Sequence, residues 1–252
     1  MRQMNSVEKA LTVLKRLAEP PFEFGVTELA AEIRITKGGM HSLLGSLIAS
    51  GFVAQNPLSK KYMLGPANFR LGTVYSQKKG FRELAGEVME NLARSTKYNI
   101  VLGLLEDSCA VIAHMVKGEK ETLYFGWIGQ KLPLHAGVIG KVLVAFLPPE
   151  EIRETFSGRP LEKFTPYTPT DPEQLIKQCE TIRSQGYMVG TGERVANVFA
   201  VGVPIFDKNG LLLASLSMVG PLNDYSEEKQ REWVLMLASA AKDITDRLSL
   251  RS

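Results

Sequence analysis

Apolar residues recur at helical spacing in three stretches of the first 50 residues. The first predicted helix begins after Asn5, because Asn5 and Glu8 have the spacing of a capping box, and it ends before Pro20. Thr27 is predicted to cap a short second helix that reaches about residue 33. The apolar positions at helical spacing are Val7, Ala10, Leu11, Leu14, Leu17 and Ala18 in the first helix and Leu29, Ala30 and Ile33 in the second.

A third helix and a hairpin follow directly. Thr36 is suited to cap this helix, and Gly51 is suited to the position just past its end. Residues 52–55 and 60–64 are typical of two short strands, with residues 56–59 as the turn between them. The inner stripe of the third helix is Met40, Leu43, Leu44, Leu47 and Ile48. This order predicts a winged helix-turn-helix, in which the second helix of the turn unit enters the major groove of DNA.

The outer side of the third helix has only small residues along its central line, namely Gly38, Ser42, Gly45 and Ala49. Each glycine inside a helix costs roughly 1 kcal/mol relative to alanine. Small residues allow the helix backbone to approach phosphates and base edges closely, which compensates for that cost. The alternative is a surface helix that packs against another helix through its small face. The expected DNA contacts of the helical part are Thr27, Thr36, Lys37, Gly38, Gly39, His41, Ser42 and Ser46.

The predicted wing has a lysine pair, Lys60 and Lys61, at its turn. A solvated lysine pair is common on any protein surface. Its position after the helix-turn-helix favours contact with a phosphate or with the minor groove, so we add both lysines to the expected DNA contacts.

The remaining chain predicts an α+β domain with a mainly antiparallel sheet and flanking helices. Pro66 is suited to the first turn of a linker helix over residues 66–79, with a domain boundary near residue 80. Strands are predicted over residues 98–106, 109–118, 121–129, 187–191, 198–206 and 211–220, and helices over 81–96, after 137, over 171–186 and from 226. The expected domains are therefore residues 1–65, the linker helix 66–79 and residues 80–252.

Charge separates the chain into two parts. The 252 residues have a formal net charge of +3, but residues 1–79 contain 11 basic and 5 acidic residues and thus have a net charge of +6. This excess favours a nucleic-acid-binding module at the start of the chain. Cys109 and Cys179 are 70 residues apart, which is typical of a reduced protein. The sequence has no run of 18 apolar residues and no signal peptide at its start, so we expect a cytoplasmic protein without a membrane span.

No group of residues has the spacing of a known catalytic site. The histidines, His41, His114 and His135, do not lie in a cluster with metal-ligand spacing, so we expect neither a metal ion nor a cofactor. Residues 137–141 lack the full spacing of a phosphate-binding loop, and Ser215 and Ser217 lack the strand-to-helix elbow of serine hydrolases. We therefore do not expect an enzyme.

Three blocks of the sequence resemble the IclR family of bacterial transcriptional regulators. SVEKALTVLKRLAE followed by VTELAAEIRITKGGMHSLLGSLIASGFV resembles the DNA-binding half of the family. LPLHAGVIGKVLVAFLP resembles the family segment LHxTxxGKAxLAxLP, and GYMVG with AVGVPIFDKNGLLLASLSMVGP resembles its closing strands. Together the blocks cover nearly the whole chain.

The resemblance implies a winged-helix domain, a GAF-like C-terminal domain that binds a small organic effector, and assembly into homodimers or homotetramers. The effector pocket would lie beneath the LPLHAG loop and against the last strands. The residues implied are Leu134, His135, Ala136, Gly137, Gly190, Ala200, Ser215, Ser217 and Val219.

Two departures from the family pattern affect the expected ligands. Family members usually have Lys-Ser-Thr-Val-His-Arg where this chain has Lys-Gly-Gly-Met-His-Ser at residues 37–42, so we expect a different or weaker operator preference. Members that bind small oxoacids have polar residues at the positions that correspond to Gly190, Ala200 and Val219. Because a carboxylate is costly to desolvate among apolar walls, we expect a larger, apolar or aromatic effector. The alternative is that these residues only fill the core.

The sequence thus predicts a DNA-binding transcriptional regulator whose affinity for a roughly palindromic operator depends on a small ligand. Two other functions stay open at this point. One is an enzyme-like C-terminal domain with a DNA-binding appendage. The other is a DNA-binding protein that binds no ligand and uses its second domain only for assembly.

Overall fold

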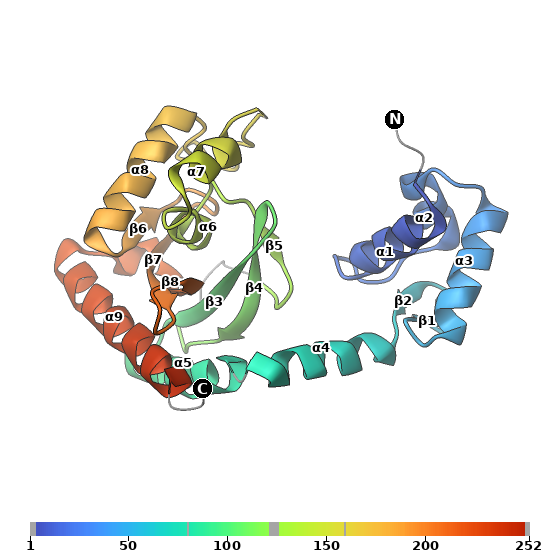
Figure 1. The fold of residues 1–252 in the computed structure, drawn as a ribbon, viewed down its shortest axis with the longest axis horizontal. Coiled ribbons are helices and arrows are strands. Elements are labelled where there is room, and N and C mark those ends of the chain that lie inside the picture. Colours follow the sequence, from blue (N-terminus) through green and yellow to red (C-terminus); the bar gives the residue numbers. More distant parts are fainter. Residues whose placement is uncertain (1–3, 80, 121–125, 159, 250–252) are drawn as a thin grey trace. The chain divides into compact units, whose positions relative to one another are not determined.

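A computed structural model of the chain describes residues 4–79, 81–120, 126–158 and 160–249 (Figure 1). Contacts within the chain group it into two units, residues 1–79 and residues 80–252, and each is described here by itself.

The first unit has the predicted order of helices and strands. Its elements are α1 (Ser6–Leu17), α2 (Val26–Ile33), α3 (Lys37–Ala49), β1 (Val53–Gln55), β2 (Tyr62–Leu64) and α4 (Pro66–Lys79). The two strands pair antiparallel, with Ala54 opposite Met63. Three helices and a two-stranded wing therefore form a winged helix-turn-helix, which confirms the predicted fold of this part (Figure 1).

Local side-chain contacts set the ends of these helices. The capping box of α1 is present, since the Asn5 side chain accepts from the Glu8 backbone and Glu8 accepts from the Asn5 backbone. The Thr36 side chain caps α3 as predicted, and Gly51 has a φ of 75° just past its end. The prediction for Thr27 is wrong, because Thr27 lies inside α2. Gly25 is the N-cap of α2, and its backbone N–H donates to Glu28 over 2.6 Å.

The core of the first unit joins α1, α2, α3 and the wing. The predicted inner residues of α2 are buried, and so are Met40, Leu44 and Leu47 of α3. The prediction for Ile48 is wrong, because this side chain is 40% exposed at the end of α3. In α1 the expectation is partly wrong, because Val13 and Leu17 are the buried residues while Val7 and Leu11 are exposed. Apolar spacing alone does not show which part of a wide apolar surface faces the core.

The second unit is an antiparallel sheet with helices on both faces. Its strands are β3 (Asn99–Glu106), β4 (Cys109–Val116), β5 (Lys131–Leu132), β6 (Met188–Thr191), β7 (Val198–Phe206) and β8 (Leu212–Pro221), in the order β5-β4-β3-β8-β7-β6. Its helices are α5 (Phe81–Thr96), α6 (Val138–Val144), α7 (Pro149–Phe156), α8 (Pro172–Gln185), the short 3-10 helix η1 (Leu222–Asp224) and α9 (Glu227–Ser249). This confirms the predicted α+β class with an antiparallel sheet.

Helices lie on both sides of the sheet (Figure 1), and alternate residues of its strands belong to different clusters. On one face Ile100, Phe199 and Met218 belong to a cluster packed on α5 and α9, where Phe199 stacks on Trp233 at 4.6 Å between ring centroids. On the other face Val101 and Val219 belong to a cluster packed on α6, α7 and α8. The sheet is therefore the middle of three layers, with a hydrophobic core on each side.

The second unit differs from the sequence predictions in its local structure. The predicted strand over residues 121–129 falls partly on residues 121–125, outside those described, while residues 126–129 form a loop and a turn. The helix after residue 137 ends at Val144, and α7 begins at Pro149, which the sequence analysis did not predict. No helix in the described ranges is long and apolar enough to cross a membrane.

Candidate functional site

The outer face of α3 is exposed along its whole length. Of the expected DNA contacts, all ten side chains or glycine positions are exposed, and those of α3 lie on one helix from Lys37 to Ser46. In the first turn the Gly39 backbone N–H donates to Thr36 Oγ1 over 3.1 Å. The two N–H groups before it have no intrahelical partner, as is usual at the start of a helix. The outer face of α3 therefore has small side chains along its length and a positive charge, that of Lys37, at its start.

The glycines of α3 differ in what they do for the protein. A Cβ atom built on Gly39 would lie 3.2 Å from Thr36 Oγ1, so Gly39 leaves room for the cap. A Cβ atom on Gly38 or Gly45 would meet no described atom within 4 Å. No described helix therefore packs against these two glycines. A partner outside the chain is the better explanation for them.

In the second unit a pocket lies between α6, β6, β7, β8 and the loop that joins β6 to β7. About 500 Å³ of its space, including the open mouth, is free of atoms. Its lining is Leu132, Ala136, Gly137, Val138, Ile139, Gly190, Gly192, Glu193, Arg194, Val195, Val198, Ala200 and Val219. Nearly all of these side chains are apolar or absent, so the walls suit an apolar ligand body.

The pocket brings together five of the nine predicted effector residues, namely Ala136, Gly137, Gly190, Ala200 and Val219. The other four lie outside its lining. Leu134 is in the core, and His135 Nε2 lies 2.8 Å from the Glu162 carbonyl oxygen.

Ser215 and Ser217 are covered by α6. Both are fully buried on the sheet face toward α6, opposite Gly103 and Gly202. A Cβ atom on Gly202 would lie 2.4 Å from Val138 Cγ1 and 2.8 Å from Ser217 Oγ. The glycines thus let α6 lie directly on the strands, and this close approach separates the serines from the pocket. Neither serine hydroxyl has a hydrogen-bond partner among the described residues, so neither has a base beside it.

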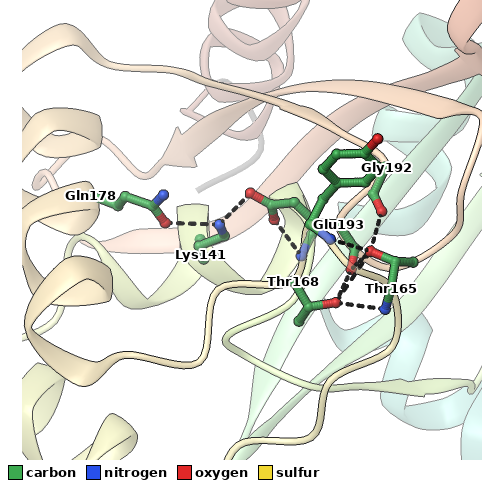
Figure 2. A network of polar contacts seen from close by, with 8 residues as sticks. Lys141, Thr165, Thr168, Gln178, Gly192 and Glu193 are labelled. Atoms are coloured by element: carbon green, nitrogen blue, oxygen red, sulfur yellow. Dashed lines mark hydrogen bonds and ion pairs between the residues drawn. The ribbon is translucent and has the colours of Figure 1, made fainter.

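A buried ion pair fixes one side of the pocket (Figure 2). Lys141 Nζ donates to Glu193 Oε1 over 2.7 Å and to Gln178 Oε1 over 2.9 Å. The other carboxylate oxygen of Glu193 accepts from the Gly137 backbone N–H over 2.9 Å. The Lys141 side chain is 0% exposed and that of Glu193 is 12% exposed. The pair therefore joins α6 and its preceding loop to the β6–β7 loop.

The same loop is held by two threonines (Figure 2). Thr165 Oγ1 donates to the Gly192 carbonyl over 2.6 Å, and Thr168 Oγ1 donates to the Glu193 carbonyl over 2.5 Å. Both threonines are buried and come from the segment before α8. The backbone of the pocket wall at residues 192–193 is thus fastened by side chains far away in the sequence.

Burial sets the charge states of two groups near this site. Desolvation lowers the pKa of Lys141 below its ordinary value of 10.5, while the adjacent Glu193 carboxylate opposes that shift. Burial raises the pKa of Cys179 to about 12, so this thiol is protonated at neutral pH. Among the described residues no group of three or more His, Cys, Asp or Glu could hold a metal ion.

The comparisons with known proteins now decide the family. The model of the IclR helix-turn-helix domain matches residues 6–57, and the model of the bacterial transcriptional regulator IclR C-terminal domain matches residues 73–246. The chain belongs to the IclR family of bacterial transcriptional regulators. It is a helix-turn-helix regulator with a C-terminal effector domain.

Relatives and solved structures agree with this assignment. The chain is 32% identical over 242 residues to the HTH-type transcriptional regulator KdgR of Escherichia coli, covering 96% of this chain and 92% of the relative. The crystal structure of a putative IclR regulator from Silicibacter sp. TM1040 has the same fold, with a TM-score of 0.87, 24% identity and coverage of 97% and 96%. An IclR homologue from Microbacterium hydrocarbonoxydans, solved in complex with 4-hydroxybenzoate, matches with a TM-score of 0.85, 22% identity and coverage of 98% and 100%.

Sequence reasoning missed the part of the pocket that comes from the β6–β7 loop. Glu193, Arg194 and Val195 lie between two predicted strands, where no periodicity distinguishes them. A lysine inside an apolar helix was the available signal, because Lys141 has to be paired when α6 is buried.

Removal of the Glu193 carboxylate should destabilise the second unit strongly. Glu193→Ala leaves the Lys141 charge buried with one neutral partner, which costs about 3 kcal/mol. Both tryptophans of the chain, Trp127 and Trp233, are in this unit, so their fluorescence during urea unfolding reports on it. The loss should shrink as the pH rises toward 10.5, because the folded state of the variant favours neutral Lys141 more than the unfolded chain does.

Glu106→Ala is the matched control for this variant. Glu106 pairs with Lys131 over 3.5 Å, but both side chains are more than 40% exposed, and such pairs contribute about 1 kcal/mol or less. Equal losses in the two variants would contradict the buried character of the Lys141–Glu193 pair.

Gly45→Ala should stabilise α3 and weaken DNA binding at the same time. Alanine gains about 1 kcal/mol at an exposed helical position, and no described atom opposes the added methyl group. If the outer face of α3 enters the groove as predicted, the same methyl group would keep the backbone away from the DNA. Hydrogen exchange of the α3 amides and anisotropy of labelled DNA measure the two effects.

Gly72→Ala in α4 serves as the control for Gly45→Ala, since this helical glycine also has open space around it. It should give a similar gain in helix stability with unchanged DNA binding. A Gly45→Ala protein that binds DNA as tightly as the parent would contradict close approach of α3 at this position.

Proposed function

We propose that this regulator reads duplex DNA with the outer face of α3 and the wing, and that a small apolar or aromatic effector in the C-terminal pocket changes its operator affinity. The single observation that supports the DNA face best is the exposed line of small residues on α3. A Cβ atom at Gly38 or Gly45 in this line would meet no atom of the described residues within 4 Å. Lys37 at the start of α3 and Lys60 and Lys61 on the wing supply the positive charge for phosphates.

The proposed division of labour follows the expected domains. Residues 1–65 bind DNA, the helix over residues 66–79 links the domains, and residues 80–252 bind the effector and assemble the oligomer. The effector acts by binding one arrangement of the subunits more tightly than another. The linker helix would transmit the difference as a change in the spacing of the α3 helices.

The pocket walls support an apolar effector. Gly190, Ala200 and Val219 offer no polar side-chain group to a ligand, and Val138, Val195 and Val198 extend the same surface. The only acidic side chain in the lining, Glu193, is already paired with Lys141. The family member with bound 4-hydroxybenzoate is a precedent for an aromatic ligand in this fold. We propose that the remaining effector contacts predicted from the resemblance, Leu134, His135, Ser215 and Ser217, act by supporting the walls.

Exposed apolar side chains support assembly into homodimers or homotetramers. Val7 and Leu11 of α1 are 67% and 52% exposed, and Phe69 of α4 is 80% exposed. A second copy of the chain would cover such side chains. A dimer places two α3 helices on DNA, so the proposed operator is palindromic. Because a bacterial regulator meets its DNA in the cytoplasm, we propose that location for the protein. We propose that the protein has no catalytic activity of its own, in keeping with the solitary buried hydroxyls of Ser215 and Ser217.

A charge on the centre of the α3 face should abolish operator binding. Ser42 is exposed in α3, so Ser42→Glu should leave the fold intact and repel DNA phosphates. The assay is fluorescence anisotropy with duplexes that tile the promoter of the protein's own gene, at several salt concentrations. The control is Ser184→Glu, which makes the same change at an exposed position of α8 and should bind DNA as the parent does. Undiminished binding by Ser42→Glu would mean that α3 does not face DNA.

Aromatic acids such as 4-hydroxybenzoate should bind the pocket more tightly than glyoxylate or pyruvate. Both kinds of ligand must desolvate a carboxylate, but only the aromatic ring buries a large apolar area against the walls. Isothermal calorimetry with each acid measures this difference. Ala200→Val, which adds two methyl groups to the half-buried lining, should weaken aromatic binding with little change in melting temperature. Tight binding of glyoxylate with no binding of aromatic acids would contradict the apolar effector.

A further inference from the structure

An exposed leucine, Leu58, lies in the turn at the tip of the wing. Leu58 is 92% exposed, more than any other large apolar side chain among the described residues. Isolated exposed leucines are common on protein surfaces and by themselves indicate nothing. The surroundings of Leu58 distinguish it from the others.

The backbone that holds Leu58 is fixed by hydrogen bonds. Asn56 Oδ1 accepts from the backbone N–H groups of Leu58 over 2.9 Å and Ser59 over 3.2 Å. The Lys60 backbone N–H closes the turn on the Asn56 carbonyl over 2.9 Å, and Gln55 Nε2 donates to the Lys60 carbonyl over 2.8 Å. A turn held in this way loses little conformational entropy when its tip binds a partner.

Glu23 fastens this turn to the helix-turn-helix. Its two carboxylate oxygens accept from Asn56 Nδ2 over 2.9 Å and from Ser59 Oγ over 3.1 Å. The next residue, Phe24, pairs with Tyr62 of β2 through two backbone hydrogen bonds of 3.0 and 2.8 Å. The tip of the wing and the core of the first unit therefore move together, and Leu58 is presented at a fixed place relative to α3.

The positive charges near Leu58 favour a negatively charged partner. Lys60 and Lys61 are exposed on the same turn, and the first unit as a whole is basic. A leucine with two exposed lysines close by in the same turn fits a partner that combines an apolar floor with negative charge. The minor groove of duplex DNA has this chemistry, and leucine is among the side chains that proteins wedge between base steps there.

We propose that Leu58 enters the minor groove beside the sequence read by α3 and partly unstacks one base step, while Lys60 and Lys61 hold the phosphates on either side. This inference rests on the proposed function, since it requires that the first unit binds DNA through α3. It adds a source of sequence preference that needs no hydrogen bond to a base. Steps that unstack easily, such as TA and CA/TG, should be favoured under the wing.

Leu58→Ser tests the wedge on the tightest-binding duplex from the promoter of the protein's own gene. The variant should bind about tenfold more weakly, because the apolar side chain is no longer buried on binding. The dependence of affinity on salt should not change, since no charge is lost. Lys60→Ala, which removes a charge, should instead reduce the slope of affinity against salt concentration. Leu58→Met, which keeps an apolar side chain of similar volume, should bind nearly as the parent does.

Hydroxyl-radical footprints at saturating protein locate the contact. The parent should protect the minor groove on the flanks of the site, and Leu58→Ser should lose this protection while it keeps the footprint at the centre. A 2-aminopurine placed at the flanking step should brighten with the parent and not with the variant. Leu211→Ser is the matched control, because Leu211 is a 65% exposed leucine on a turn of the second unit and should affect none of these signals.

Failure of the wedge and failure of the proposed function give different results. If the parent binds one duplex tightly, Ser42→Glu abolishes binding and Leu58→Ser matches the parent in affinity and footprint, the wedge is wrong and the proposed function stands. If the parent binds every duplex equally weakly and Ser42→Glu makes no difference, both are wrong. If Leu58→Ser changes the sedimentation of the free protein but not its footprint, Leu58 contacts a second copy of the chain, which also overturns the wedge.

Discussion

A lysine ammonium with no exposure to water requires a counter-charge, and the counter-charge of Lys141 holds one wall of the pocket beside α6. The ammonium lies in α6, on the central sheet, and Glu193 comes from the loop between two strands on the other side of the pocket. Either charge alone would cost several kcal/mol at this depth. The β6–β7 loop is thus held against α6, and its backbone between Gly192 and Glu193 is held a second time by Thr165 and Thr168. A pocket with mostly apolar walls thus has one wall, at residues 192–193, that is held by a polar network.

Glycine has opposite roles in the two units. Under α6 it removes a side chain so that two parts of the same chain can touch, as at Gly202, where a Cβ atom would lie 2.4 Å from Val138 Cγ1. On α3 the same residue lies in the open, and neither Gly38 nor Gly45 makes room for any described atom. A residue that costs helix stability and gives the protein no internal contact is best explained by a partner outside it. Geometry thus identifies Gly202 as a packing glycine and leaves Gly38 and Gly45 without a packing role among the described residues.

Local sequence signals predicted most elements because each depends on a few neighbouring residues. The capping box at Asn5, the Thr36 cap and the strands of the second unit are of this kind. Predictions failed where the choice depends on partners far away in the chain. Thr27 resembles a cap in sequence, but the Glu28 side chain selects the Gly25 backbone instead, and Val7 and Leu11 have helical spacing without facing the core. Glu193 could not be found at all, because its partner Lys141 is 52 residues away and the sheet brings them together.

Two acidic residues of the first unit, Glu23 and Glu32, also bind partners that are distant in the sequence. A carboxylate near a surface that binds DNA repels phosphates, so Glu23 in a basic unit calls for a structural reason. Both of its oxygens are used to hold the turn of the wing, through Asn56 and Ser59. Similarly, Glu32 pairs with Arg16 over 2.7 Å, which joins α1 and α2 and places Arg16 over the ring of Phe24 at 3.9 Å. The negative charges are thus neutralised or occupied within the fold, while Lys37, Lys60 and Lys61 stay exposed. These contacts leave the net charge of the unit unchanged, but they fix where the negative charges lie. The exposed lysines of α3 and the wing, which we propose to lie near the grooves, are therefore not paired with these two carboxylates.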